Sequence, residues 1–277
     1  MRRFFLALFI FFSASGCAAI NQSSDRGYPA EKIASSYGFE KFYIHAGQFR
    51  LAAFGRFGKP AESVTIYIEG DGHAWQTRSL VSLDPTPLNP LVLLLAVKDD
   101  SSNVVYLARP GQYPVSLKPD CGNEYWAAKR FAPEVIESMN QAVSQIKQSS
   151  GAEKIELIGY SGGAAIAVLI AAQRQDVSSL RTIAGNLDHE AISRFHRVDL
   201  LAGSLNPIDY ASNISNIPQR HFAAENDKIV PLVILQSFVE REGDIDHKSL
   251  SVVKGTTHDS GWEKKWSELI SLPFFGG

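Results

Sequence analysis

The sequence predicts an α/β fold in which a mostly parallel β-sheet is covered by helices on both faces. Short apolar segments of strand length recur from residue 64 onward, and longer apolar runs with helical spacing lie between them. Glycine and polar residues follow these strand segments. Such alternation of strands and helices is typical of a parallel sheet with helices on both faces. At 277 residues, the chain can bury the core of one such domain.

The predicted elements follow in chain order. Residues 39–47 and 48–55 are predicted to be two β segments joined at Ala46 and Gly47, which gives the sheet an antiparallel start. The later strands are predicted at the short apolar segments 64–68, 104–108, 154–158, 180–184, 221–224 and 250–253. The helices are predicted at the apolar runs 90–98, 134–147, 164–172, 231–240 and 262–270. Because polar residues gather after the strands, we expect a ligand site at the carboxyl edge of the sheet.

The N-terminal residues are predicted to lie outside this fold. Arg2 and Arg3 precede the apolar residues 4–12, which are too few to span a bilayer, so the segment is predicted to be a secretory signal. Residues 14–17, Ala-Ser-Gly-Cys, are similar to the lipobox of bacterial lipoproteins, in which the cysteine is lipidated and becomes the new N-terminus. We therefore expect a signal peptide of lipoprotein type at residues 1–16 and lipidation at Cys17. The alternative is an ordinary cleaved signal with an incidental cysteine.

The domain boundaries follow from composition. Residues 17–36 are rich in Ser, Asn, Gln and Asp and are predicted to be a tether, which leaves residues 37–277 as the folded domain. An acyl anchor at Cys17 would hold this domain on a membrane. Ala18, rather than aspartate, follows the cysteine. By similarity to the sorting pattern of double-membraned bacteria, this implies the outer membrane, with the domain facing the periplasm.

The charge balance argues against a nucleic-acid partner, and the cysteine content argues against an internal disulfide. The 27 basic and 29 acidic residues form no run of like charge, so nucleic acid, which needs a concentrated basic face, is not expected as a partner. Cys121 is the only cysteine besides Cys17, so a lipidated Cys17 leaves no internal disulfide. Cys121 lies in a loop without a strand–turn–helix frame, and we interpret it as structural rather than nucleophilic.

Residues 159–163, Gly-Tyr-Ser-Gly-Gly, fit the pattern G-x-S-x-G in the context that gives the pattern meaning. They follow the predicted strand 154–158 and precede the apolar run 164–172. A serine at such a tight turn is held in a strained conformation with its hydroxyl at the end of the sheet. The helix N-terminus adds free N–H groups and a positive partial charge beside that hydroxyl. The motif therefore predicts a nucleophilic serine at Ser161.

With this motif, the chain resembles the α/β-hydrolases over residues 39–275. The family places nucleophile, acid and histidine in that chain order, and Ser161, Asp227 and His258 follow it. A serine hydroxyl needs a base as it attacks a carbonyl, imidazole titrates near neutral pH, and a carboxylate orients the imidazole. The resemblance therefore implies a triad of these three residues. Asp188, which ends the preceding strand, remains the alternative acid.

The same resemblance implies an oxyanion hole. One donor would be the backbone N–H of Gly162, directly after the nucleophile. The second would come from the turn after strand 64–68, where Glu69-Gly70-Asp71-Gly72 is similar to the family's H-G-x-G turn with glutamate in place of histidine. The alignment makes the N–H of Asp71 the donor and leaves Gly72 as the alternative. A carboxylate at Glu69 is expected to repel anionic substrates.

Three further residues are candidates for the substrate pocket. His73 follows the glycine-rich turn, and Trp75 and Trp262 lie near the catalytic loops, where they could contact an acyl group. Core packing is the alternative for both tryptophans. Residues 187–218, between two predicted strands, are predicted to form a small cap over the serine.

These features together predict a lipid-anchored serine hydrolase of the bacterial cell envelope. It would cleave carboxylic esters of small or lipid-like substrates through an acyl-enzyme, and no metal or organic cofactor is implied. Thioesters, lipids and peptides remain open as substrates. The other class of function is a non-catalytic binding or assembly lipoprotein that retains a hydrolase scaffold.

Overall fold

The computed structural model describes residues 27–59, 61–114, 121–244, 246 and 249–275. The predicted signal peptide and the predicted lipidation site Cys17 lie outside these residues. Within them, no helix combines the length and the apolar character that crossing a membrane requires.

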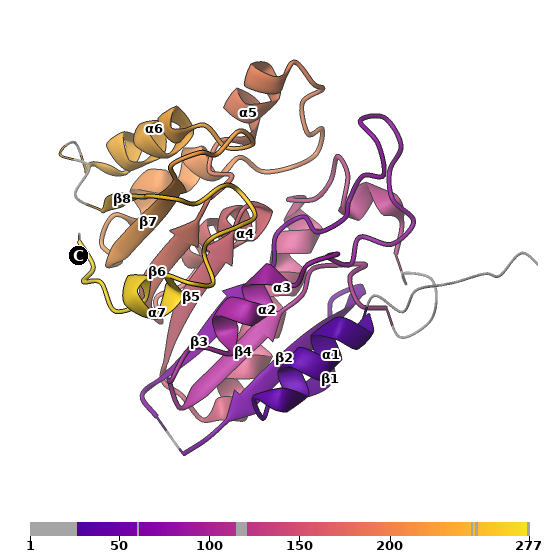
Figure 1. Ribbon diagram of the computed structural model, residues 1–277, viewed down its shortest axis with the longest axis vertical. Helices are drawn as coiled ribbons and strands as arrows, with labels where there is room; N and C mark the ends of the chain where they lie inside the picture. The colour runs from indigo at the N-terminus through magenta and orange to yellow at the C-terminus, as the bar shows by residue number, and fades with distance from the viewer. Residues whose placement is uncertain (1–26, 60, 115–120, 245, 247–248, 276–277) are drawn as a thin grey trace, which may run out of the picture.

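An eight-stranded sheet forms the centre of the molecule, as predicted (Figure 1). Its strands lie in the order β1-β2-β4-β3-β5-β6-β7-β8. The β1/β2 and β2/β4 pairs are antiparallel, and all other pairs are parallel. The strands are β1 Glu40–Ala46, β2 Phe49–Phe57, β3 Ser63–Ile68, β4 Asn103–Leu107, β5 Lys154–Tyr160, β6 Val177–Ile183, β7 Gln219–Ala224 and β8 Leu250–Val253.

Helices cover both faces of the sheet and bury two apolar clusters against it (Figure 1). One face carries α3 Pro133–Ser150, α4 Gly162–Ala171, the 3-10 helix η2 Pro207–Ile214 and α6 Leu232–Glu242. The other carries α1 Gly27–Ser36, α2 Leu91–Ala96 and α7 Trp266–Leu269. The remaining helices are η1 Asn123–Tyr125 and α5 His189–His196. Helix α4 is buried along its whole length, which explains why its sequence is apolar on every side.

The parallel part of the sheet brings distant segments to one edge. Strands β3 to β8 all run in the same direction, so their carboxyl ends lie at the same edge of the sheet. The loops after β3, β5, β6, β7 and β8 therefore meet there, as expected for the ligand site of an open α/β sheet. We call this the catalytic edge.

The predicted tether was wrong in its C-terminal half. Residues 27–36 form helix α1, which buries Ala30 and Ala34 against the sheet. Glu31 on this helix accepts a hydrogen bond from Lys41 Nζ at 2.7 Å. Polar residues on the outer side of α1 dominate the local composition, whereas the small apolar residues that face the core recur four positions apart. The folded part of the chain therefore begins by Gly27.

The predicted cap is smaller than expected. Only α5 and the loop up to Asn206 stand at the catalytic edge (Figure 1). The second half of the predicted cap, η2, buries Ala211 and Ile214 in the apolar cluster beneath α4 and α6. Residues 207–214 thus belong to the body of the domain, because their apolar side chains complete the helical layer on that face.

Candidate active site

Ser161 lies at the sharp turn between β5 and α4. Its backbone has φ 50° and ψ −119°, a region that non-glycine residues rarely adopt. Two hydrogen bonds hold it there: Ser161 N–H donates to Ile183 O at 2.9 Å, and Asn186 N–H donates to Ser161 O at 3.0 Å. The neighbouring strand β6 and the loop after it therefore stabilise the strained turn.

Two glycines of the motif are needed for close backbone approach. A Cβ atom at Gly159 would lie 2.5 Å from Gly163 O, and one at Gly163 would lie 2.2 Å from Ile68 O. Both distances are far below any van der Waals contact, and both partners are backbone atoms that cannot move aside. The glycines thus let α4 start directly against β5 and β3, which places the serine at the catalytic edge.

The structure brings Ser161, His258 and Asp227 together in one hydrogen-bonded chain. His258 Nε2 lies 3.0 Å from Ser161 Oγ, and His258 Nδ1 lies 2.9 Å from Asp227 Oδ2. Asp227 Oδ1 accepts hydrogen bonds from the N–H groups of Ile229 and Val230, both at 2.8 Å. With Asp227 accepting a hydrogen bond from Nδ1–H, Nε2 is the ring nitrogen that can accept the hydroxyl proton of the serine.

The loop that carries His258 is held by two aromatic side chains. Trp262 Nε1 donates to Thr257 O at 2.9 Å and to His258 O at 3.1 Å. The Tyr160 hydroxyl donates to His258 O at 3.0 Å, and the Tyr160 and His258 ring centroids lie 5.4 Å apart. Trp262 itself is fully buried in the apolar cluster beneath α7. The prediction that Trp262 lines the pocket was therefore wrong, because core packing takes its ring.

Asp188, the alternative acid, is engaged elsewhere. It is the N-cap of α5, where its Oδ1 accepts hydrogen bonds from Ala191 N–H at 3.0 Å and Asn206 Nδ2 at 2.9 Å. Asp227 rather than Asp188 is the carboxylate that reaches the imidazole.

The predicted oxyanion turn lies beside the nucleophile. Gly162 is the first residue of α4, so its N–H has no acceptor within the helix. A Cβ atom at Gly162 would lie 2.1 Å from Asp71 Oδ1, which shows how closely the turn after β3 approaches it. Gly72 has φ 62°, and a Cβ there would lie 2.1 Å from Pro85 O. Gly72 therefore shapes the turn through its conformation.

The sequence analysis missed two arginines that hold this turn. The Asp71 carboxylate forms ion pairs with Arg109 and Arg130. Burial alone would raise the pKa of Asp71, but the charges of Arg130 and Arg109 outweigh it and lower the pKa to about 2. Arg109 also donates to Arg130 O at 2.8 Å. Arg109 directly follows β4 at the catalytic edge, a position that could have marked it, whereas nothing in the sequence marks Arg130.

Glu69 was expected to repel anionic substrates, but its side chain is buried in the protein and does not face the cavity. It is 2% exposed, and it accepts hydrogen bonds from Gly70 N–H at 2.8 Å and from the Tyr106 hydroxyl at 2.9 Å. Burial raises the pKa of Glu69 to about 7, although these two hydrogen bonds and the charge of Arg109 act in the opposite direction. Glu69 therefore connects the turn after β3 to strand β4, because its carboxyl group binds both Gly70 N–H and Tyr106.

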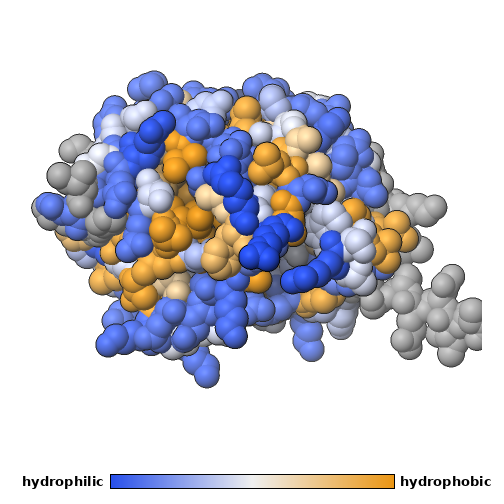
Figure 2. Space-filling model, turned by 90° about the horizontal axis from the view of Figure 1, so that it is seen from above, coloured by the Kyte–Doolittle hydropathy of each residue, from blue (hydrophilic) through white to orange (hydrophobic). Residues whose placement is uncertain are grey.

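A cavity of about 560 Å³ opens at the catalytic edge between the loop after β3 and helix α5. Trp75, Leu200 and Ile229 contribute apolar walls, and Asn186 and Arg130 also line it, whereas the triad residues do not. Asn186 adjoins the nucleophile, because its N–H donates to Ser161 O. Asn186 Oδ1 is buried and has no hydrogen-bond partner among the described residues. Figure 2 looks onto this edge and shows hydrophobic areas separated by hydrophilic side chains.

Of the predicted pocket residues, only Trp75 lines this cavity. His73 is half-buried in the turn after β3, and its backbone N–H donates to Pro85 O at 2.9 Å. The segment after β3 contributes Trp75, Thr77 and Arg78 to the cavity wall but not His73, so the structure does not place His73 in the pocket.

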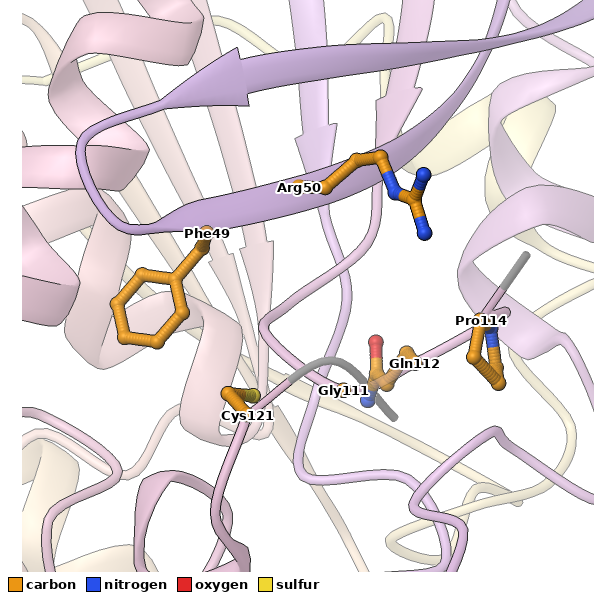
Figure 3. A pocket seen from close by; sticks show the side chains of 6 residues that line it. All are labelled: Phe49, Arg50, Gly111, Gln112, Pro114 and Cys121. Carbon is orange, nitrogen blue, oxygen red and sulfur yellow. The ribbon is translucent and has the colours of Figure 1, made fainter. Parts of the chain in front are cut away.

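Cys121 does not line this cavity and lies instead in the small hollow of Figure 3, together with Phe49 and Gly111. This hollow has a volume of about 10 Å³, which is about the size of one water molecule. Within the described part of the chain, His, Cys, Asp and Glu side chains form no group of three or more that could hold a metal ion.

Several solved structures share this fold. A serine hydrolase homologue from Coxiella burnetii is 19% identical, with a TM-score of 0.54 over 83% of this chain and 93% of the other. An esterase from Pyrococcus furiosus is 15% identical, with a TM-score of 0.59 over 86% and 91%. The acylaminoacyl peptidase of Pyrococcus horikoshii is 14% identical, with a TM-score of 0.60 over 84% of this chain but only 40% of the peptidase.

No family model and no curated protein matches the sequence. The likeness thus rests on architecture: an eight-stranded, mostly parallel sheet with flanking helices. The chain has the α/β-hydrolase fold.

Proposed function

We propose that this protein is a serine hydrolase that cleaves carboxylic esters through an acyl-enzyme. The observation that carries the proposal is the hydrogen-bonded chain from Ser161 through His258 to Asp227, with distances of 3.0 and 2.9 Å, at a strained turn of the catalytic edge. The site is assembled for catalysis without rearrangement, which supports an enzyme over a non-catalytic scaffold.

In the proposed reaction, Ser161 Oγ attacks the ester carbonyl while His258 Nε2 takes the hydroxyl proton. Asp227 stabilises the imidazolium that forms. When the tetrahedral intermediate collapses, His258 returns this proton to the departing alkoxide, and the acyl group stays on Ser161. A water molecule, deprotonated by His258, then attacks the carbonyl of the acyl-enzyme. When this second intermediate collapses, the bond to Ser161 Oγ breaks, His258 returns the proton to Oγ, and the acid is released.

The surroundings of Gly162 support oxyanion stabilisation. The N–H groups of Gly162 and Asp71 are the proposed donors to the carbonyl oxygen as its charge develops. A Cβ at Gly162 would lie 2.6 Å from Arg109 Nη1, so a guanidinium is adjacent to the donor. Arg109, Arg130 and the ionised Asp71 together carry a net positive charge beside the nucleophile. This charge favours a negative intermediate.

The cavity supports an amphiphilic ester as the substrate. Its volume of about 560 Å³ lies within the range of pockets that hold small organic ligands, and its walls are mainly apolar. Asn186 places one unpaired amide beside the nucleophile, where it can bond a polar group close to the scissile carbonyl. Thioesters and peptides are the competing substrates, and an acylaminoacyl peptidase is among the proteins that share the fold.

The proposed location is the bacterial envelope, with a lipid anchor on Cys17 and the outer membrane as the site. The motif at residues 14–17 and the preceding apolar residues 4–12 support it. Metabolic labelling with a radioactive fatty acid tests it. We expect the full-length chain to be labelled and the variant Cys17→Ser to be unlabelled; labelling of both would contradict the anchor at Cys17.

An activity-based probe tests the hydrolase. We expect the purified full-length chain to react with a fluorophosphonate and to hydrolyse p-nitrophenyl esters. The variant Ser161→Ala should do neither, whereas Ser212→Ala, at an exposed serine of η2, should match the wild type. Probe labelling that persists in Ser161→Ala, or a wild type inert in both assays, would overturn the proposal.

A further inference from the structure

The catalytic edge carries nearly all the strongly exposed apolar side chains of the described protein. Nine large apolar residues are more than half exposed, and eight of them lie in the segments that follow β3, β6 and β7, including helix α5 and the start of α6. Leu83 is the most exposed at 78%, and Leu88 and Phe195 follow at 65% and 60%. We call the exposed apolar side chains of residues 80–88, 195–200 and 229–233 the apolar rim. Such a concentration on one face is typical of a surface that binds another apolar surface.

The apolar rim is continuous with the substrate cavity. Leu200 and Ile229 belong to the rim and also line the cavity. His196 Nε2 lies 2.8 Å from Ile229 O and joins α5 to the loop of the catalytic acid. An apolar molecule in contact with the rim therefore lies at the mouth of this cavity, and one cavity residue, Asn186, is hydrogen-bonded to the backbone of Ser161.

The chain also starts at this edge. Strand β1 is antiparallel to β2, and β2 is antiparallel to β4, so β1 runs toward the catalytic edge. Residues 37–39 turn the chain back between α1 and β1, and the two elements pack against each other. Helix α1 therefore runs the opposite way and begins near the catalytic edge (Figure 1). The ninth strongly exposed apolar residue, Tyr28, is at this beginning.

The distance to the proposed anchor is short. Residues 18–26 separate Cys17 from Gly27, and nine residues span at most about 30 Å when fully extended. A lipid on Cys17 would thus hold the catalytic edge, rather than the opposite one, near the bilayer. Exposed cations also lie next to the rim residues in sequence, at Arg78, Arg197 and Lys228, where they can pair with lipid phosphates.

We propose that the apolar rim docks on the lipid bilayer and that the enzyme takes an amphiphilic ester directly from it. The proposal rests on the hydrolase function and the lipid anchor proposed above. Docking removes the rim from water, and the ester chain passes from the bilayer along Leu200 and Ile229 into the cavity without crossing water. A lipid surface is favoured over a protein partner because the proposed anchor already holds this edge close to lipid.

Trp75 offers a direct readout of docking. It is 39% exposed at the catalytic edge, whereas Trp126, Trp262 and Trp266 are at most 5% exposed. The full-length chain is reconstituted in vesicles of phosphatidylethanolamine and phosphatidylglycerol, with or without brominated acyl chains that quench tryptophan. The emission of Trp75 is the difference between the wild type and Trp75→Phe. We expect bromolipids to quench most of this difference. Unquenched Trp75 emission would overturn the proposal and would point to a protein partner for the rim.

A rim variant separates docking from catalysis. In Leu83→Asp/Phe195→Asp we expect the loss of Trp75 quenching and about a tenfold slower hydrolysis of a long-chain ester embedded in the vesicles. Hydrolysis of a soluble short-chain ester should be unchanged, which also shows that the variant is folded. The matched control is Phe57→Asp, at the 42%-exposed end of β2 on the opposite edge, and it should behave like the wild type.

The outcomes distinguish the two proposals. Equal losses in the rim variant and in Phe57→Asp, or equal losses on both esters in the rim variant, would overturn docking. A quenched wild type that hydrolyses neither ester would contradict the hydrolase and leave docking intact. A wild type that hydrolyses the soluble ester while its Trp75 emission stays unquenched would contradict docking and leave the hydrolase proposal intact.

Discussion

The buried carboxyl of Glu69 makes the stability of this protein depend on pH in a way that one substitution removes. Burial raises the pKa of Glu69 from its ordinary value of 4.5 to about 7. The unfolded chain therefore loses this proton at a lower pH than the folded protein does. Below pH 4.5 both states are protonated; between pH 4.5 and 7 only the folded state keeps the proton, so its stability falls as the pH rises.

The size of the effect follows from the two pKa values. At 1.36 kcal/mol for each pH unit, the interval from 4.5 to about 7 corresponds to about 3 kcal/mol. Glu69→Gln keeps an oxygen that can accept from Gly70 N–H, and its amide can donate to the Tyr106 hydroxyl oxygen. The variant has no carboxyl group to titrate at this position, so its stability should not fall in this way. Its free energy of unfolding relative to that of the wild type should therefore rise by about 3 kcal/mol between pH 4.5 and 8.

Thermal unfolding of the full-length chain in mild detergent measures this difference. For a domain of this size, about 3 kcal/mol corresponds to about 6–12 °C in Tm. Glu40→Gln, at an exposed carboxylate of β1, controls for the loss of one negative charge. A Tm gap between Glu69→Gln and the wild type that stays constant across this pH range would refute the reasoning, because it would mean that folding leaves the pKa of Glu69 unchanged.

Three further predictions concern the site. Asp227→Asn should lower kcat about 10⁴-fold, whereas Asp188→Asn should leave kcat within severalfold of the wild type; equal losses in steady-state ester hydrolysis would contradict the acid assignment. Trp262→Phe removes the donor to Thr257 O and His258 O and should slow fluorophosphonate labelling about tenfold with little change in KM; an unchanged labelling rate would show that the indole does not position the loop. Gly163→Ala should lower the free energy of unfolding by several kcal/mol, because its Cβ would lie 2.2 Å from Ile68 O, and the variant should therefore unfold at a lower urea concentration. An unchanged midpoint in a urea titration followed by circular dichroism would contradict this prediction.

The parts of the site that a local pattern encodes could be predicted from the sequence. The elbow at residues 159–163 places a short strand, two close-packed glycines and an apolar helix in one continuous segment. The acid could not be decided in the same way. Asp188 and Asp227 both follow strands of the sheet, and the choice depends on Asn206, which binds Asp188 from 18 residues away.

Residues whose role depends on packing were harder to predict. Trp262 and Trp75 are both tryptophans near catalytic loops, but the first is buried under α7 and the second is exposed at the cavity. The burial of Glu69 depends on Tyr106, a residue of the neighbouring strand β4. Helix α1 was not predicted, because its buried alanines add little hydrophobicity to a segment that is otherwise polar.

The side chain of Tyr160 links the nucleophile to the base through a single residue. Tyr160 is the variable position of the G-x-S-x-G pattern, yet its hydroxyl reaches the backbone of His258, 98 positions further on. We therefore expect the turn that carries Ser161 and the loop that carries His258 to move together, so that Oγ and Nε2 stay within hydrogen-bonding distance as the surrounding loops fluctuate.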